Sequence, residues 1–245
     1  MSLAGALLPS RKDEDFRYAD LGALERVWPV PVEEIALGPC ESRALVLVPE
    51  GDAVVRHLAI TLGPGARFDL RVLNAGHAYG RVAIDVRLGQ GADFTCGAAQ
   101  VGGGAQVLEV VTNVVHAGPD ATSRQVVRSV LSGQATGTYL GKVTVERGAD
   151  GTDGEQSVRA MLLDRTATAN ARPELEIYAD DVKCAHGCAV GELDAQGLFY
   201  LQSRGLPPAE AKRLMLQAFL AEAFVGADAE EQLNEAALAA LEALL

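Results

Sequence analysis

The sequence predicts a mainly β protein built as a parallel β-helix, with a short N-terminal segment and a C-terminal helical domain. From about Glu41 to Gly191 the chain consists of short β-branched runs of five to nine residues, separated by glycine turns. No run of ten or more residues with helical periodicity lies between them, so the crossover helices of a doubly wound parallel sheet are missing.

The glycine turns also recur at a nearly constant spacing. LGPGARF at 62–68 is echoed by LGQGADF at 88–94, and the marker glycines are 26, 29 and 30 residues apart: Gly63, Gly89, Gly118 and Gly148. Such a period is typical of solenoids, in which each coil stacks on the previous one and glycines occupy tight corners. An antiparallel sandwich with similar turns is the alternative fold.

The N-terminal segment, residues 1–40, is mixed and charged. Its stretch from Lys12 to Trp28 predicts a short helix or two, which would cap the core rather than form it. The apolar residues Leu3–Leu8 precede the basic pair Arg11 and Lys12, the reverse of a secretory signal, so we expect a cytoplasmic protein. The β-helix core is expected over residues 41–191.

Residues 192–245 shift to Ala, Leu and Glu and predict three helices. The first lies within Leu193–Gly205, with an Asp N-cap and a terminal Gly. The second starts at Pro207 and Pro208 and presents a face with Leu214, Ala218 and Leu220–Ala221. The third, within Asp228–Leu245, has a stripe that must pack on the end of the solenoid or on a partner: Leu233, Ala237, Leu241 and Leu244.

Composition excludes several classes of function. The formal charge is −12, from 21 basic and 33 acidic residues, which repels nucleic acid and anionic lipid. The longest stretch without a charged residue, Phe94–Leu108, is too short to span a bilayer. Four cysteines in a chain of 245 residues do not form a disulfide framework and are expected to be free thiols or ligands.

The densest reactive cluster lies within residues 180–191. If this segment is extended, Cys184, His186 and Cys188 project to one side, unless Gly187 breaks the alternation. Two thiolates and an imidazole suit zinc, iron or an iron-sulfur unit. The set is incomplete by itself, because no C-x-x-C pair or second histidine lies nearby. The alternative is three packed residues without a chemical role.

Motifs of self-contained enzymes are missing from the sequence. There is no phosphate-binding loop, no G-x-S-x-G elbow and no H-E-x-x-H helix. The adjacent carboxylates Asp180 and Asp181 would point apart in a strand. We therefore expect a protein that is not an enzyme.

The stretch from Val126 to Phe219 closely resembles the C-terminal half of the SufB/SufD family, the scaffold subunits of the SUF iron-sulfur cluster assembly complex. The resemblance rests on SG-x-A-x-G-x-x-x-GK, TD-x-x-Q, P-x-LEIYADDVKC-x-HG and LD-x-x-x-LFYL-x-SRG. RKDEDFRYADL at 11–21 is similar to an N-terminal segment of the family, with Phe16 in place of the usual Trp. This segment and KC-x-HG favour the SufD branch.

The resemblance implies a right-handed parallel β-helix that pairs with a SufB-like subunit. It also implies that the C-terminal helical region binds a SufC-like ABC ATPase. His186 would lie at the subunit junction and take part in building a transient iron-sulfur cluster, with Cys184 in support. Cys188 stands where the family commonly has a small residue, so its role as a further ligand is an extrapolation. Whether the complex also uses a flavin stays open.

Two other functions are possible for such a chain. One is a solenoid enzyme, a thiol-dependent hydrolase or acyltransferase that uses Cys184 or Cys188 with His186; the sequence offers no third residue to orient the histidine. The other is a plain interaction module that docks through its helices. The chain is also shorter than usual for the family, mostly ahead of Val126, which predicts fewer coils or a reduced N-terminal region.

Overall fold

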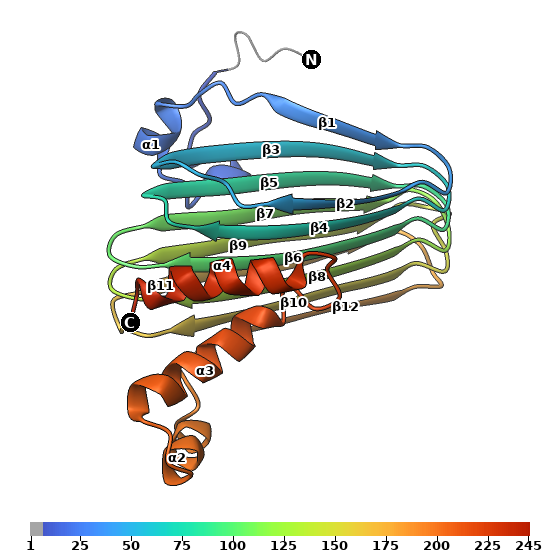
Figure 1. Ribbon diagram of the computed structural model, residues 1–245. Coiled ribbons are helices and arrows are strands. Elements are labelled where there is room, and N and C mark those ends of the chain that lie inside the picture. Colours follow the sequence, from blue (N-terminus) through green and yellow to red (C-terminus); the bar gives the residue numbers. More distant parts are fainter. Residues whose placement is uncertain (1–6) are drawn as a thin grey trace.

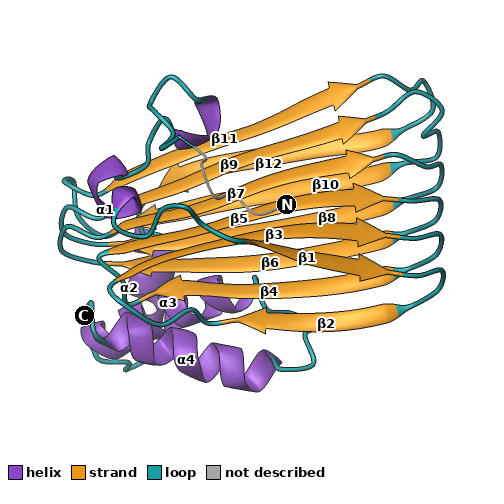
Figure 2. Ribbon diagram, turned by 90° about the horizontal axis from the view of Figure 1, so that it is seen from above, coloured by secondary structure: helices purple, strands orange, loops and turns teal. Residues whose placement is uncertain are grey.

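The computed structural model describes residues 7–245 and shows a parallel β-helix with two facing six-stranded sheets (Figures 1 and 2). Successive strands alternate between the sheets, so two strands make one coil. Sheet A contains, in spatial order, β1 (Val32–Leu37), β3 (Ala53–Leu62), β5 (Tyr79–Leu88), β7 (Val107–His116), β9 (Thr136–Val145) and β11 (Thr168–Ile177). Sheet B contains β2 (Ser42–Leu47), β4 (Arg67–Ala75), β6 (Asp93–Gly102), β8 (Thr122–Leu131), β10 (Asp153–Leu162) and β12 (Lys183–Gly191).

The predicted parallel β-helix is thus confirmed, and the antiparallel sandwich is wrong, because every strand pair is parallel. The solenoid begins earlier than expected, since β1 starts at Val32 within the expected N-terminal segment. Residues 1–6 of that segment, including part of the apolar stretch Leu3–Leu8, lie outside the described residues.

The glycine period has a steric origin at the corners marked by Gly89 and Gly118, whereas Gly148, with a φ of +80°, has no atom within 4 Å of an added Cβ. A Cβ on Gly89 would lie 2.9 Å from the carbonyl oxygen of Leu62, and a Cβ on Gly118 would lie 2.4 Å from the backbone nitrogen of Gln90. Both are closer than real Cβ contacts allow. The corner of one coil therefore rests directly on the backbone of the preceding corner, and only glycine fits there.

The main core lies between the sheets. Alternate residues of each strand point inward and form one cluster that runs along the solenoid, and its fully buried members include Leu58, Leu70, Leu88, Phe94 and Val127. In-register pairing stacks equivalent positions of successive coils on one another. Each inward position therefore begins a column of side chains that continues through the solenoid.

Two C-terminal helices cover the outer face of sheet B. They are α3 (Pro208–Ala221) and α4 (Glu230–Glu242), and they form a second core with Leu73, Ala99 and Val130 of the sheet. The predicted stripe of α4 is confirmed, because Leu233, Ala237 and Leu241 are buried. They pack on the flank of the solenoid rather than on its end.

The predicted face of α3 is wrong for Leu214 and Ala218 and confirmed for Leu220. Leu214 and Ala218 are exposed, whereas the buried residues are Ala211, Leu216, Phe219 and Leu220. The helix is turned so that Phe219, its largest apolar side chain, meets the sheet, where the guanidinium of Arg128 lies 5.9 Å from the ring centroid.

Helix α2 (Ala195–Ser203) begins as predicted at the N-cap Asp194, whose carboxylate accepts hydrogen bonds from two backbone amides. Gly205 follows its end with a φ of +96°. Figure 1 shows α2 and the adjoining part of α3 extending beyond the last coil. Its ring-bearing residues Phe199 and Tyr200 are 73% and 57% exposed.

The N-terminal segment lies on the outer face of sheet A as η1 (Glu14–Phe16), a 3-10 turn, and α1 (Leu21–Glu25), matching the predicted short helices. The guanidinium of Arg81 lies 4.2 Å from the ring centroid of Phe16 and 3.1 Å from the carboxylate of the buried Glu109. The segment therefore seals the start of this face. Among the described helices, none is long and apolar enough to cross a membrane.

Candidate functional site at the last coil

The three predicted site residues lie on β12, the last strand of sheet B. Its pairing with β10 continues without a bulge past Gly187, which is opposite Ser157. Cys184, His186 and Cys188 therefore face the same side, and that side is the interior, because they are in register with the buried Gly154, Gln156 and Val158.

Each of the three residues ends one of the interior columns. Cys184 ends the column of Phe68, Phe94, Ser123 and Gly154; His186 that of Leu70, Cys96, Gln125 and Gln156; and Cys188 that of Val72, Ala98, Val127 and Val158. No further strand follows β12 in the described sheet. The interior of the solenoid thus opens at this end, and His186 lies at its centre, between the two thiols.

Exposure differs among the three residues. Cys184 is half-buried and packs against the main core, and burial raises the pKa of its thiol although a backbone hydrogen bond to Gly154 opposes this. His186 and Cys188 are exposed. Gly187 and Gly191 are at alternate positions of the strand and face the other side, where no atom lies within 4 Å of an added Cβ. The outer face of β12 is therefore uncovered at these two positions.

The strand holds these side chains side by side rather than converging on one point. Residues two apart on a strand are about 6.6 Å apart along its axis. Within residues 7–245, no three His, Cys, Asp or Glu side chains are arranged to hold a metal ion. The imidazole and thiol groups of β12 are of the type that binds iron and zinc. In the described residues, however, they do not form a complete metal site.

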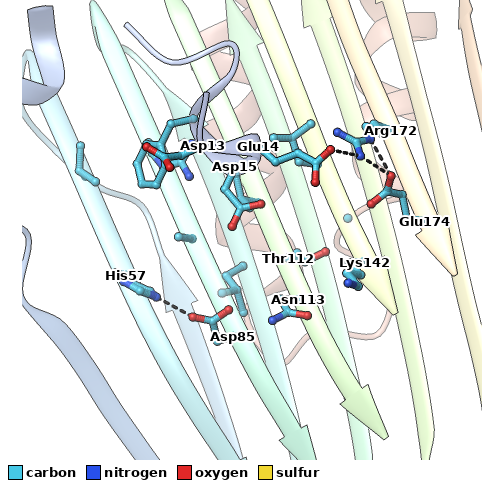
Figure 3. Close-up of a pocket in the computed structure, with 18 of the residues that line it drawn as sticks. Asp13, Glu14, Asp15, His57, Asp85, Thr112, Asn113, Lys142, Arg172 and Glu174 are labelled. Atoms are coloured by element: carbon cyan, nitrogen blue, oxygen red, sulfur yellow. Dashed lines mark hydrogen bonds and ion pairs between the residues drawn. The ribbon is translucent and has the colours of Figure 1, made fainter. Parts of the chain in front are cut away.

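A cavity of about 910 Å³ lies elsewhere, on the outer face of sheet A (Figure 3). The segment around η1 forms one wall of it, and residues of all six strands of sheet A line the floor. His57 Nε2 lies 2.7 Å from a carboxylate oxygen of Asp85, and Arg172 bridges Glu14 and Glu174.

The side chains that Figure 3 joins by dashed lines bond to one another: His57 to Asp85, and Arg172 to both Glu14 and Glu174. The guanidinium of Arg172 holds the pKa of the Glu14 carboxyl below its usual value, and Glu176 raises the pKa of Lys142. We interpret the cavity as the surface of sheet A on which the N-terminal segment packs. Sequence reasoning missed it, although the coil period would have aligned Asp85, Asn113 and Lys142 in one ladder.

None of the remaining histidines and cysteines lies on β12. His77 contacts the carbonyl oxygen of Gly51 at 2.7 Å, and His116 contacts the hydroxyl of Ser123 at 2.8 Å. Burial lowers the pKa of His116 to about 4 and raises that of Cys96 to about 12. Cys40 is exposed at the first coil, with a φ of +59°.

Comparison with known proteins agrees with the resemblance. Residues 49–219, more than half of the chain, match the family model described as "SUF system FeS cluster assembly, SufBD core domain". The iron-sulfur cluster assembly protein SufD of Escherichia coli strain K12 is 36% identical over 117 residues, which are 48% of this chain and 28% of that protein.

Two further relatives extend the comparison. SufD of Bacillus subtilis strain 168 is 36% identical over 121 residues, covering 49% of this chain and 28% of that protein. The iron-sulfur cluster assembly SufBD family protein ML0594 of Mycobacterium leprae is 32% identical over 200 residues, covering 78% of this chain and 47% of that protein. The chain thus spans less than half the length of these relatives. It belongs to the SufBD family of SUF iron-sulfur cluster assembly proteins.

Proposed function

We propose that this chain is a SufD-type scaffold subunit, without catalytic activity of its own, on which iron-sulfur clusters are assembled in the cytoplasm. The observation that carries the proposal is that His186 lies at the open end of the solenoid, between two thiols, on a strand whose outer edge pairs with no described strand. The relatives named iron-sulfur cluster assembly protein SufD support the same role.

The open end is suited to a second solenoid. The outer edges of β11 and β12 leave backbone donors and acceptors unpaired by strands in the described sheets. Around them, Ile177, Tyr178 and Val190 expose 42%, 58% and 47% of their surface. A SufB-like subunit that adds its strands here would cover this apolar surface and bring further ligands to His186.

The nascent cluster is cargo in this scheme. His186 would supply an imidazole ligand, Cys184 would support it, and Cys188 would add a thiolate if it reaches the same iron. An open set of ligands fits a cluster that must be passed on. Flavin binding by the assembled complex stays a prediction, which the visible absorbance spectrum of the purified complex would test.

The C-terminal helices are the proposed docking site of a SufC-like ABC ATPase. Phe199 and Tyr200 on α2 and Leu214 on α3 are exposed, beside the last coil. Aromatic side chains of this kind are common at the centre of protein interfaces. ATP-driven movement of α2 and α3 would then act close to β12.

The alternative of a Cys/His enzyme is less favoured. A nucleophilic thiol needs a lowered pKa, but burial raises the pKa of Cys184. The other alternative is a plain interaction module, for which His186 would have no effect on clusters. The test below distinguishes it, because clusters would then be unchanged in His186→Ala.

The test is to co-express the full chain with SufB-like and SufC-like partners and purify the complex anaerobically. With His186→Ala we expect the complex to assemble but to lose iron and acid-labile sulfide. Lys183→Ala, on the same strand but facing the other side, is the matched control and should keep both. Normal cluster content with His186→Ala would refute the role of His186, and absence of a complex with the native chain would refute the scaffold assignment.

A further inference from the structure

A buried carboxamide lies directly behind the proposed ligand His186. Gln156 is 1% exposed, and within residues 7–245 its side-chain Oε1 has no hydrogen-bond partner. A buried carbonyl oxygen without a donor is uncommon, since such groups cost free energy unless they are paired. The position of this acceptor therefore indicates a missing donor.

The neighbours of Gln156 fix which end of its amide is free. Tyr139 is buried, and burial raises the pKa of its hydroxyl, so the hydroxyl keeps its single proton. Tyr139 donates that proton to Gln125 Oε1 at 3.2 Å. Its oxygen accepts from Gln156 Nε2 at 3.0 Å and also lies 3.0 Å from the hydroxyl of Thr112. The Nε2 end is engaged, and Oε1 is left as the acceptor.

The register leaves one partner on the outer side. Gln156 pairs with Gln125 on β8 toward the interior and with His186 on β12 toward the open end. Side chains at paired positions of parallel strands stack on the same face. His186 is thus the next side chain of this column beyond Gln156, and a neutral imidazole carries one N–H and one lone pair.

We propose that Gln156 is a positioning residue for His186: its Oε1 accepts the ring N–H and so fixes the tautomer that presents the other ring nitrogen to incoming iron. Hydrogen bonds from the second nitrogen commonly orient histidines that bind metals. This inference rests on the proposed role of His186, but the proposed hydrogen bond does not require a cluster and can be tested without one.

Nitrogen NMR of the full chain labelled at its histidine rings tests the contact. The chain has four histidines, and loss of one signal set in His186→Asn assigns the ring. We expect one tautomer of His186 in about tenfold excess over its ratio in free histidine, since one hydrogen bond is worth about this factor. In Gln156→Leu the excess should disappear, and in Gln156→Glu, which keeps an acceptor, it should persist.

Gln100→Leu is the matched control. Gln100 is also a fully buried interior amide, donates to the carbonyl oxygen of Thr138 at 3.1 Å, and lies in a different column. Its loss should leave the His186 tautomer ratio unchanged. Gln156→Met serves as a second replacement without an acceptor if Gln156→Leu does not fold.

The inference is overturned if the native His186 ratio equals that of free histidine, or if Gln156→Leu and Gln156→Met leave it unchanged. In the anaerobic complex, Gln156→Leu should lower iron affinity about 10- to 100-fold. A tautomer that depends on Gln156 while His186→Ala keeps its clusters would refute only the proposed function. Lost clusters in His186→Ala with a tautomer independent of Gln156 would refute only the positioning.

Discussion

The flank and the open end of sheet B contrast sharply in how they are covered. On the flank, α3 and α4 bury small and apolar residues, and the guanidinium of Arg71 donates to the carbonyl oxygen of Ala223 at 2.9 Å. At the end, His186 and Cys188 are exposed on a strand that nothing in the described chain covers. Side chains with metal-binding chemistry thus lie where residues 7–245 supply no cover.

Replacing glycine with alanine should give the largest difference in unfolding free energy between the flank and the open end. A Cβ on Gly97 would lie 1.7 Å from the carbonyl oxygen of Ala223, so Gly97→Ala must displace the chain between α3 and α4. We expect it to lower the free energy of unfolding by about 3 kcal/mol. Gly187→Ala meets no atom and should change it by less than about 0.5 kcal/mol. Urea unfolding of both variants would measure this, and equal losses would contradict the contrast.

Acid should destabilise the covered interior. The folded pKa of His116 is about 4, below its ordinary 6.5, so between these values the unfolded chain binds the extra proton and stability falls with falling pH. From pH 7 to pH 5 we expect a loss of about 2 kcal/mol from this residue. Replacing His116 with Asn should flatten the slope of unfolding free energy over this range; an unchanged slope would show that another group is responsible.

The ion pair that joins the flank to its helices should have a smaller effect. Arg128 Nη2 lies 2.7 Å from Glu222, whose side chain is 44% exposed, and Arg128 keeps two backbone carbonyl partners without it. We expect Glu222→Gln to cost about 1 kcal/mol. Glu155→Gln, which breaks the exposed pair with Arg124, is the control and should cost close to nothing.

Thiol labelling should map the contrast without any mutation. With iodoacetamide, Cys40 and Cys188 should react first, Cys184 more slowly, and the buried Cys96 only on unfolding. Mass spectrometry after timed labelling would give the order. Addition of a SufB-like partner should protect Cys188 and leave Cys40 reactive. Protection of Cys40 alone would contradict the proposal, because it would place the interface at the first coil instead of the last.

Much of the fold follows from local patterns. Glycines recur at Gly63, Gly89 and Gly118 because the backbone of one coil corner lies on the backbone of the preceding corner. Their spacing in the sequence therefore predicts the stacked coils. The helical spacing of Leu233, Ala237 and Leu241 also predicted the buried face of α4. The rotation of α3 was not, because its alanines and leucines leave several faces possible and the choice is made by contacts with Phe219.

The candidate site was predictable only in part. Alternation along an extended strand was enough to group Cys184, His186 and Cys188. That this group faces inward follows from its register with Gly154 and Gln156, which are thirty residues earlier. Gln156 carries no motif that marks it for metal chemistry. Its importance depends on an unpartnered oxygen, which is a property of packing and not of sequence.

The parallel arrangement has a consequence for handling the protein. At one extremity β1 and β2 end the sheets, and at the other β11 and β12 do. The two extremities are different surfaces, so contact between them would be head-to-tail and need not close into a ring. Copies of this chain whose open end is left uncovered are therefore at risk of polymerising into filaments.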